Sequence, residues 1–278
     1  MKILFAGCGD IGCRAASRLV ADFTCAGFKR NPQTLPDFIQ PLAGSMADRD
    51  RLVDVLSRGF DIVVASLTPD AFSEEGYRRA YVDSAKTLAE AMTLSESVPK
   101  LVIWVSSTSV YGDNNGEWVD EQSVTEPQSF SGKLILEAEQ HIANLPCAST
   151  IVRFSGIYGP GRTRMLDQIR AGKGRPAEPK QWSNRIYSED CGAVLEHLVR
   201  RFVDGVELDG LYIASDSEPV TQHQLRKWLA AQLGVTLQEE HSEQKAIRRC
   251  SNQRLLDTGY QFLYPSYRDG YRALIDQQ

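Results

Sequence analysis

The sequence predicts an α/β fold, with a doubly wound parallel sheet and helices on both of its faces. Short apolar runs alternate along the first half of the chain with longer stretches whose apolar residues recur at helical spacing. Such alternation is typical of parallel strands joined by crossover helices. The predicted strands are residues 3–6, 25–28, 61–65, 101–105 and 149–154, and the predicted helices between them are residues 12–23, 48–57, 74–94 and 133–145.

The second half of the chain is less regular and indicates a smaller second domain. The sequence Gly159-Pro160-Gly161 interrupts the alternation, and residues 172–183 are rich in Gly, Pro and charged residues, which is typical of a loop. Three further elements are expected: a helix at 190–202, a strand at 211–214, and a helix at 221–233 that is capped by Thr221 and ended by Gly234. We therefore assign residues 1–160 and 186–214 to a main domain, and residues 161–185 and 215–278 to a small one.

A glycine turn, Gly7-Cys8-Gly9-Asp10-Ile11-Gly12, joins the first predicted strand to the first predicted helix. In this position the first glycine permits a tight turn, the second lets a pyrophosphate approach the backbone, and the third allows close packing of helix on strand. The helix N-terminus then faces the anion. The turn predicts a Rossmann-type dinucleotide site, although Asp10 is unfavourable near a pyrophosphate unless it points to solvent or caps the helix.

Lys29 and Arg30 follow the second predicted strand, where an NAD-binding protein usually offers Asp or Glu to the ribose hydroxyls. Cations there favour the additional 2′-phosphate of NADP. We therefore expect NADP as the cofactor, with NAD as the alternative. The competing interpretation is that the two cations are solvated at the start of a loop.

Composition excludes several other classes of function. A formal net charge of -5 argues against a general nucleic-acid binder, and no apolar run approaches the length of a membrane span. The six cysteines show no Cys-x-x-Cys spacing and the four histidines are scattered, so neither a metal site nor a disulfide framework is expected. These features predict a cytoplasmic protein whose partner is a small-molecule substrate.

Several later motifs occur in a fixed order. They are Ser-Ser-Thr-Ser-Val-Tyr-Gly at residues 106–112, Arg-Phe-Ser-Gly-Ile-Tyr-Gly-Pro-Gly at 153–161, Asn-Arg-Ile-Tyr-Ser-Glu-Asp at 184–190 and Glu-Pro-Val-Thr at 218–221. Together they resemble the extended short-chain dehydrogenase/reductase family, also called the NAD-dependent epimerase/dehydratase family. The resemblance covers nearly the whole chain. It implies a cofactor-binding domain and a small C-terminal domain that closes over a substrate, often a nucleotide sugar.

The resemblance also assigns catalytic positions, and one of them departs from the family. Ser107 fits the hydroxyl that hydrogen-bonds the reacting group, and Lys133 fits the lysine of the Tyr-x-x-x-Lys pair. The tyrosine position holds Ser129, whose hydroxyl is too weak an acid to replace a phenol. The chain thus resembles the atypical members of the family.

Three interpretations of Ser129 stay open. Another acid serves the reaction, with Tyr111, Tyr158 or Tyr187 as candidates. Alternatively, the protein binds a dinucleotide without turning it over, as a regulatory or sensor protein. In the third interpretation Lys133 is a surface residue that matches the pattern by accident.

The remaining site residues complete the expectation. In the cofactor site, Ser45 and Met46 stand where the family usually has Asp and Leu before the adenine, and Ser66 and Phe154 are further candidates. Tyr111, Tyr158, Arg162, Asn184 and Arg185 are the expected substrate contacts, and the arginines suit a phosphate or carboxylate.

The sequence therefore predicts an atypical NAD(P)-binding epimerase, dehydratase or reductase acting on a small polar substrate. A homodimer through the helices at 74–94 and 133–145 is an open alternative. The aromatic residues near the C-terminus are expected to pack the small domain rather than form a binding site; they are Trp228, Tyr260, Tyr264, Tyr267 and Tyr271.

Overall fold

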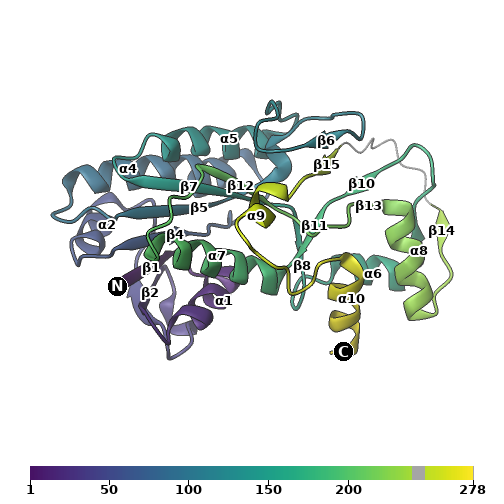
Figure 1. The fold of residues 1–278 in the computed structure, drawn as a ribbon, viewed down its shortest axis with the longest axis horizontal. Helices are drawn as coiled ribbons and strands as arrows, with labels where there is room; N and C mark the ends of the chain where they lie inside the picture. The colour runs from purple at the N-terminus through teal and green to yellow at the C-terminus, as the bar shows by residue number, and fades with distance from the viewer. Residues whose placement is uncertain (240–247, 278) are drawn as a thin grey trace. The chain divides into compact units, whose positions relative to one another are not determined.

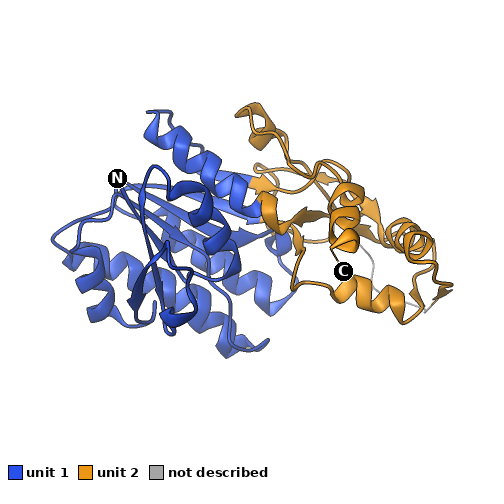
Figure 2. Ribbon diagram, turned by 90° about the horizontal axis from the view of Figure 1, so that it is seen from below, with its two compact units in different colours: residues 1–110, 127–153, 191–212 blue, residues 111–126, 154–190, 213–278 orange. Residues whose placement is uncertain are grey.

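The computed structural model describes residues 1–239 and 248–277, which divide into two compact units (Figure 2). Unit 1 comprises Met1–Val110, Pro127–Arg153 and Cys191–Tyr212, and unit 2 comprises Tyr111–Glu126, Phe154–Asp190 and Ile213–Gln278. The segment 111–126, which the sequence analysis places in the main domain, thus belongs to unit 2. The reason is local pairing, because β6 (Trp118–Val119) runs parallel to β15 (Arg249–Cys250) of the same unit.

A seven-stranded parallel sheet forms the centre of the fold, in the order β12-β7-β5-β4-β1-β2-β3 (Figure 1). β1 lies between β2 and β4, so the turn that follows β1 is flanked by the ends of these two strands. The sheet confirms the predicted Rossmann-like α/β fold. Its strands are β1 (Lys2–Ala6), β2 (Thr24–Lys29), β3 (Gln40–Ala43), β4 (Ile62–Ala65), β5 (Leu101–Ser107), β7 (Ala148–Phe154) and β12 (Leu211–Ala214).

Helices cover both faces of this sheet (Figure 1). α1 (Asp10–Leu19) and α7 (Ser188–Val203) lie on one face, while α2 (Arg49–Leu56), α4 (Ser84–Leu94) and α5 (Phe130–Ala143) lie on the other. The second group packs on an apolar core of fully buried strand and helix residues, including Leu4, Val63, Val102, Leu88 and Ala138. Two short 3-10 turns, η1 (Pro32–Thr34) and η3 (Thr108–Val110), follow β2 and β5.

The single helix predicted at 74–94 is wrong in one respect, because a π-helical segment interrupts it. α3 (Glu74–Tyr77) leads into the π-helical η2 (Arg78–Asp83), and α4 follows. Ser73 caps α3, since its hydroxyl accepts a hydrogen bond from the Gly76 amide at 3.1 Å. A π-helical turn shifts the faces of the helix relative to each other, so η2 presents different side chains than a continuous α-helix would.

In unit 2, the described residues form short strands and helices around an aromatic core. β8 (Gly156–Tyr158) pairs with β11 (Arg185–Tyr187), β9 (Lys173–Gly174) with β14 (Gln238–Glu239), and β10 (Trp182–Ser183) with β13 (Val220–Thr221). The helices are α6 (Arg164–Arg170), α8 (Gln222–Leu233), α9 (Gln253–Asp257) and α10 (Tyr267–Asp276).

The predicted packing role of the C-terminal aromatic residues is confirmed. Tyr267 and Tyr271 are each 1% exposed within the core cluster of unit 2, and Trp228 and Tyr264 pack against that cluster. The predicted limits of α8 are also confirmed, because Thr221 forms a capping box and Gly234 ends the helix in the left-handed conformation at φ 66°.

No helix in the described part of the chain is long and apolar enough to cross a membrane. Across the same residues, no three His, Cys, Asp or Glu side chains are grouped so that they could hold a metal ion.

Candidate functional site

A cavity of about 650 Å³ lies in unit 1 beside the glycine turn. Its lining comes from the segments at the ends of β1, β2, β3 and β4, and from α3, η2 and the first residue of α4. The carboxyl edge of a parallel sheet is where nucleotides bind in open α/β folds. The lining residues used below are Gly7, Cys8, Gly9, Lys29, Arg30, Thr34, Ser45, Met46, Thr68, Asp70, Gly76 and Arg79.

The glycines of the turn have distinct structural roles. Gly7 has φ +71°, and a Cβ there would lie 2.5 Å from a Leu67 methyl and 2.7 Å from the Ser66 carbonyl oxygen. Gly9 has an ordinary extended backbone, and a Cβ there would meet only the Gly7 carbonyl oxygen, at 3.8 Å. Gly9 is therefore not required by the fold, and its bare surface suits a ligand that approaches the backbone closely. This open face fits a pyrophosphate at the N-terminus of α1.

Asp10, the unfavourable acid of the turn, is directed along its own helix. Its carboxylate accepts a hydrogen bond from Arg14 Nε at 2.8 Å, and Asp10 is not among the residues that line the cavity. At the first position of α1 its charge also interacts favourably with the helix dipole. Ile11 and Gly12 are buried in the same first turn and do not line the cavity.

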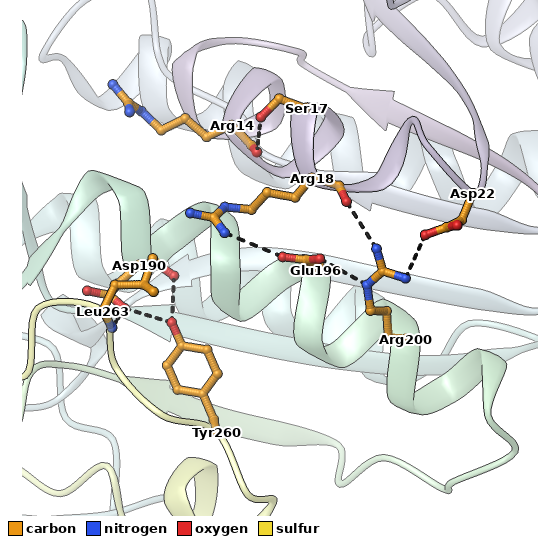
Figure 3. Close-up of polar contacts among 9 residues, drawn as sticks. All are labelled: Arg14, Ser17, Arg18, Asp22, Asp190, Glu196, Arg200, Tyr260 and Leu263. Carbon is orange, nitrogen blue, oxygen red and sulfur yellow. Dashed lines mark hydrogen bonds and ion pairs between the residues drawn. The ribbon is translucent and has the colours of Figure 1, made fainter.

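Helix α7 fixes α1 and therefore the turn. Gly192 of α7 contacts α1 so closely that a Cβ there would lie 2.8 Å from Arg14 Cβ. A network then joins the two helices (Figure 3): Arg200 binds Glu196 at 2.9 Å, Asp22 at 2.9 Å and the Arg18 carbonyl oxygen at 3.1 Å. Within unit 2, the start of α7 is held separately by Asp190, which accepts a hydrogen bond from the Tyr260 hydroxyl at 2.8 Å (Figure 3).

The lining of the cavity includes three cations, Lys29, Arg30 and Arg79. Lys29 Nζ donates to Thr34 Oγ1 at 3.3 Å, and Arg30 donates two hydrogen bonds to Asp70, at 2.8 and 2.5 Å. Arg79, from η2, is a third cation in the lining. Sequence reasoning selected Lys29 and Arg30 but missed Asp70 and Arg79. Asp70 lies 40 positions from Arg30 in a loop, so no local pattern links the two residues.

Of the other predicted cofactor contacts, some line the cavity and some do not. Ser45 and Met46 line the cavity, as expected of adenine contacts. Ser66 lies against Gly7 just after β4, whereas its successors Leu67 and Thr68 reach the lining. Phe154 is 1% exposed at the end of β7, in unit 2.

A pair of thiols flanks the turn. Cys8 Sγ and Cys13 Sγ are 3.9 Å apart; Cys8 is buried, while Cys13 on α1 is partly exposed. The hydrogen bond from Cys8 and the nearby charge of Lys29 lower the pKa of Cys13 to about 7. The same contact and burial raise the pKa of Cys8.

The residues predicted to stand at catalytic positions lie at the end of β5 and the start of α5. Ser107 is the last residue of β5, and its hydroxyl accepts a hydrogen bond from the Ser109 amide at 3.1 Å. Ser129 is the N-cap of α5, because its hydroxyl accepts from the Gly132 amide at 3.1 Å. Lys133 lies in the first turn of α5 with an exposed side chain.

A buried ion pair between Glu139 and Arg153 joins the elements that carry these residues. Glu139 of α5 accepts hydrogen bonds from Ser106 Oγ at 2.5 Å and from Arg153 Nε and Nη2 at 2.9 and 2.6 Å. Glu139 and Arg153 are only 4% and 5% exposed. The network joins β5, α5 and β7, and so fixes the strand end that carries Ser107 relative to the helix that carries Lys133.

The tyrosines considered as replacement acids are core residues of unit 2. Tyr111 is buried, and its hydroxyl donates to the Asp120 carbonyl oxygen at 2.7 Å. Tyr158 is buried, and burial raises its pKa further above the ordinary value. Tyr187 is 1% exposed in the same aromatic cluster. A phenol that must lose its proton readily is disfavoured in such surroundings, so the structure weighs against all three as the acid.

The predicted substrate contacts of unit 2 differ in their surroundings. Arg162 lines a cavity of about 500 Å³ together with Arg164 and Lys173. Asn184 holds the chain near β15, since it donates to the Arg248 carbonyl oxygen at 3.1 Å and accepts from the Cys250 amide at 2.8 Å. Arg185 lies 6.0 Å from the centre of the Tyr271 ring.

Comparison with known proteins identifies the family. The family model described as the RmlD substrate binding domain matches residues 62–258, well over half of the chain. The chain belongs to this family of extended short-chain dehydrogenase/reductases. No curated protein matches the sequence.

Several solved structures are similar to this chain over nearly its whole length. A protein from Methylobacillus flagellatus, assigned to the NAD-dependent epimerase/dehydratases, is 36% identical, with a TM-score of 0.85 over 99% of this chain and 98% of that one. Human epimerase family protein SDR39U1 with NADPH is 19% identical, with a TM-score of 0.81 over 100% of both chains. UDP-glucuronic acid 4-epimerase from Bacillus cereus, with UDP-glucuronic acid and NAD, is 20% identical, with a TM-score of 0.81 over 99% of this chain and 98% of that one. The last two similarities concern the fold alone.

Proposed function

We propose that this reductase-family protein binds NADP at the glycine turn and acts as a reductase, epimerase or dehydratase on a small polar substrate. The observation that carries the proposal is the cavity of about 650 Å³, which combines the open backbone at Gly9 with the cations Lys29 and Arg30. Two structures of similar fold contain nicotinamide dinucleotides, NADPH in one and NAD in the other. A bound dinucleotide would supply the hydride chemistry, and the residues of this chain would hold and orient it.

The preference for NADP over NAD rests on charge. No acidic residue ends β2, where an NAD-binding protein would offer a carboxylate to the ribose hydroxyls. Lys29 and Arg30 stand there instead, and a 2′-phosphate is a strong acceptor for both. We expect Lys29→Ala and Arg30→Ala to weaken NADPH binding while changing NADH binding little.

The substrate proposed is small, polar and anionic, such as a nucleotide sugar. Arg162, Arg164 and Lys173 line one cavity in unit 2, and guanidinium groups suit phosphate or carboxylate oxygens. The Bacillus cereus epimerase of similar fold was solved with UDP-glucuronic acid. A cytoplasmic location remains a prediction, supported by six free cysteines.

A second function, binding of the dinucleotide without turnover, is favoured by Ser129. This residue occupies the tyrosine position of the family and caps α5. Lys133 has an exposed side chain and no phenol four residues before it. A regulatory or sensor protein needs the cofactor site and not the proton relay.

Titration of the full chain with NADPH and NADH tests the cofactor site. Gly9→Ala fills the open face of the turn without strain, so it should weaken binding of both dinucleotides at least tenfold while leaving the melting temperature unchanged. Gly210→Ala is the matched control, since a Cβ there meets nothing within 4 Å and the residue lies outside the cavity. Absence of binding to the native chain at millimolar dinucleotide, or equal binding by Gly9→Ala, contradicts the proposal.

A turnover assay separates the two functions. The native protein and Ser107→Ala are incubated with NADPH and a panel of nucleotide sugars, and oxidation of the nicotinamide and the sugar products are both followed. Turnover that disappears in Ser107→Ala supports the enzyme. Tight NADPH binding without turnover of any compound supports the binding protein.

A further inference from the structure

Arg30 and Asp70 form an ion pair in the lining of the cavity beside the glycine turn. Arg30 follows β2 and Asp70 lies in the loop after β4, and these are the two strands that flank β1. The pair therefore reaches across the end of β1, where the glycine turn begins. Both residues line the cavity, and their side chains are 65% and 52% exposed, so a ligand can reach them.

The geometry of the pair is that of an arginine holding an oxyanion. Both terminal nitrogens of Arg30 donate, one to each carboxylate oxygen, at 2.8 and 2.5 Å. Such two-point binding is also how arginine binds phosphate. The hydrogen bonds from Arg30 lower the pKa of Asp70 most, and the charge of Arg79 lowers it further. Asp70 is thus an anion held by Arg30, and Arg79 lines the same cavity.

Arg79 belongs to the π-helical segment η2. It lines the cavity from the π-helical segment, and its side chain lies 3.9 Å from the Glu75 carboxylate on an exposed surface. Among the residues that line the cavity, Asp70 is the one acid beside Lys29, Arg30 and Arg79. These three cations suit the cavity for an anion, and the Asp70 carboxylate is such an anion within the chain itself.

We propose that the Asp70 carboxylate occupies the position on Arg30 that the 2′-phosphate of NADP takes, and that Asp70 thereby sets the preference between NADP and NAD. The inference rests on the proposed function. A 2′-phosphate carries up to two charges and three acceptor oxygens, so it displaces a carboxylate from Arg30. The 2′-hydroxyl of NAD does not, and Arg30 stays paired with Asp70 when NAD binds. Asp70 therefore weakens NADP binding and leaves NAD binding nearly unchanged.

Titration with two adenosine probes tests the phosphate position alone. The probes are 2′,5′-ADP, which carries the 2′-phosphate, and 5′-AMP, which lacks it; both are titrated into the full-length protein by calorimetry. Asp70→Asn should raise the affinity for 2′,5′-ADP about two- to fivefold and leave 5′-AMP unchanged, as expected for loss of an exposed competing ion pair. Arg79→Ala should lower the affinity for 2′,5′-ADP about threefold or more, again without effect on 5′-AMP.

Each variant has a matched control outside the cavity. Asp50→Asn removes an exposed carboxylate that pairs with Arg49 at 3.2 Å, and Arg78→Ala removes the neighbouring arginine of η2, which binds Glu137. Neither control should change the affinity for either probe. In an Arg30→Ala background, the gain from Asp70→Asn should shrink, because Arg30 is no longer there to be released.

The outcomes separate this inference from the proposed function. The inference is overturned if Asp70→Asn weakens 2′,5′-ADP binding or strengthens both probes alike, or if Arg79→Ala behaves as Arg78→Ala does. In those cases the cofactor site itself stands. If the native chain and every variant bind neither probe nor NADPH, the proposed function fails, and this inference fails with it.

Discussion

The substitution Glu139→Gln tests the buried ion pair that joins β5, α5 and β7. Glutamine has the same shape as glutamate, so the change removes a charge without opening a cavity. One of the two side-chain oxygens becomes an NH₂ group, which cannot accept from Arg153 or Ser106. At least one of the three hydrogen bonds at 2.5, 2.9 and 2.6 Å is therefore lost. Arg153, only 5% exposed, keeps its charge but loses the Glu139 carboxylate as a partner.

The expected loss of stability is large. Removing one partner of a buried ion pair costs about 3–5 kcal/mol, because the remaining charge stays buried. At about 2–4 °C per kcal/mol for a domain of this size, the melting temperature should fall by roughly 6–20 °C. The loss is also a sizeable share of the total stability of a natural protein, which is about 5–15 kcal/mol.

Thermal and urea unfolding of the two variants Glu139→Gln and Glu137→Gln measure this difference. Glu137 lies on the same helix and pairs with Arg78 at 3.3 Å, but its side chain is 36% exposed. The control should therefore lose no more than about 1 kcal/mol. If Glu139→Gln loses no more stability than Glu137→Gln, the argument from burial is wrong. Adding Arg153→Met to Glu139→Gln should recover part of the loss, since the buried charge of Arg153 is then removed as well.

Three further predictions concern the turn and the catalytic positions. Alkylation of Cys13 should accelerate as pH rises through about 7, whereas Cys147, whose pKa burial raises to about 11, should stay slow; peptide mass spectrometry after timed labelling measures both rates. Gly7→Ala should destabilise the protein by about 1–3 kcal/mol because of its left-handed backbone, and urea unfolding against Gly9→Ala checks this. Ser129→Ala should cost about 1 kcal/mol through loss of the α5 cap, while Ser129→Asp keeps the cap and the stability.

The elements that sequence reasoning found were those with a strong local signal. The glycine turn was predicted because its three spaced glycines follow an apolar run and precede a helical pattern, and Gly7 has φ +71°, which favours glycine. The limits of α8 were predicted because Thr221 and Gly234 are favoured at helix ends. β3 (Gln40–Ala43) was missed because it contains Pro41, which lacks the amide that a strand usually donates. Pro41 is tolerated there because β3 lies at the edge of the sheet.

The elements that were missed depend on contacts between distant residues. The amphipathic pattern of residues 74–94 does not distinguish a continuous helix from one interrupted by a π-helical segment, so η2 and the position of Arg79 were not predicted. Glu139 and Arg153 look like ordinary charged residues, and only their meeting inside the fold explains their burial. The Arg30–Asp70 pair likewise depends on the order of β2, β1 and β4 in the sheet, which no short stretch of sequence encodes.

Ser129 has both a predicted functional position and an observed structural role. From the sequence it is predicted to stand at the tyrosine position of the proton relay; in the structure it caps α5, the helix that carries Lys133. The Ser129 hydroxyl accepts a hydrogen bond from the Gly132 amide and so stabilises the start of α5, but serine offers Lys133 no phenol. Burial of Tyr111, Tyr158 and Tyr187 leaves none of them as a ready substitute. The proposed cofactor site and the proposed proton relay thus rest on different residues of this chain, so cofactor binding and turnover have to be measured separately.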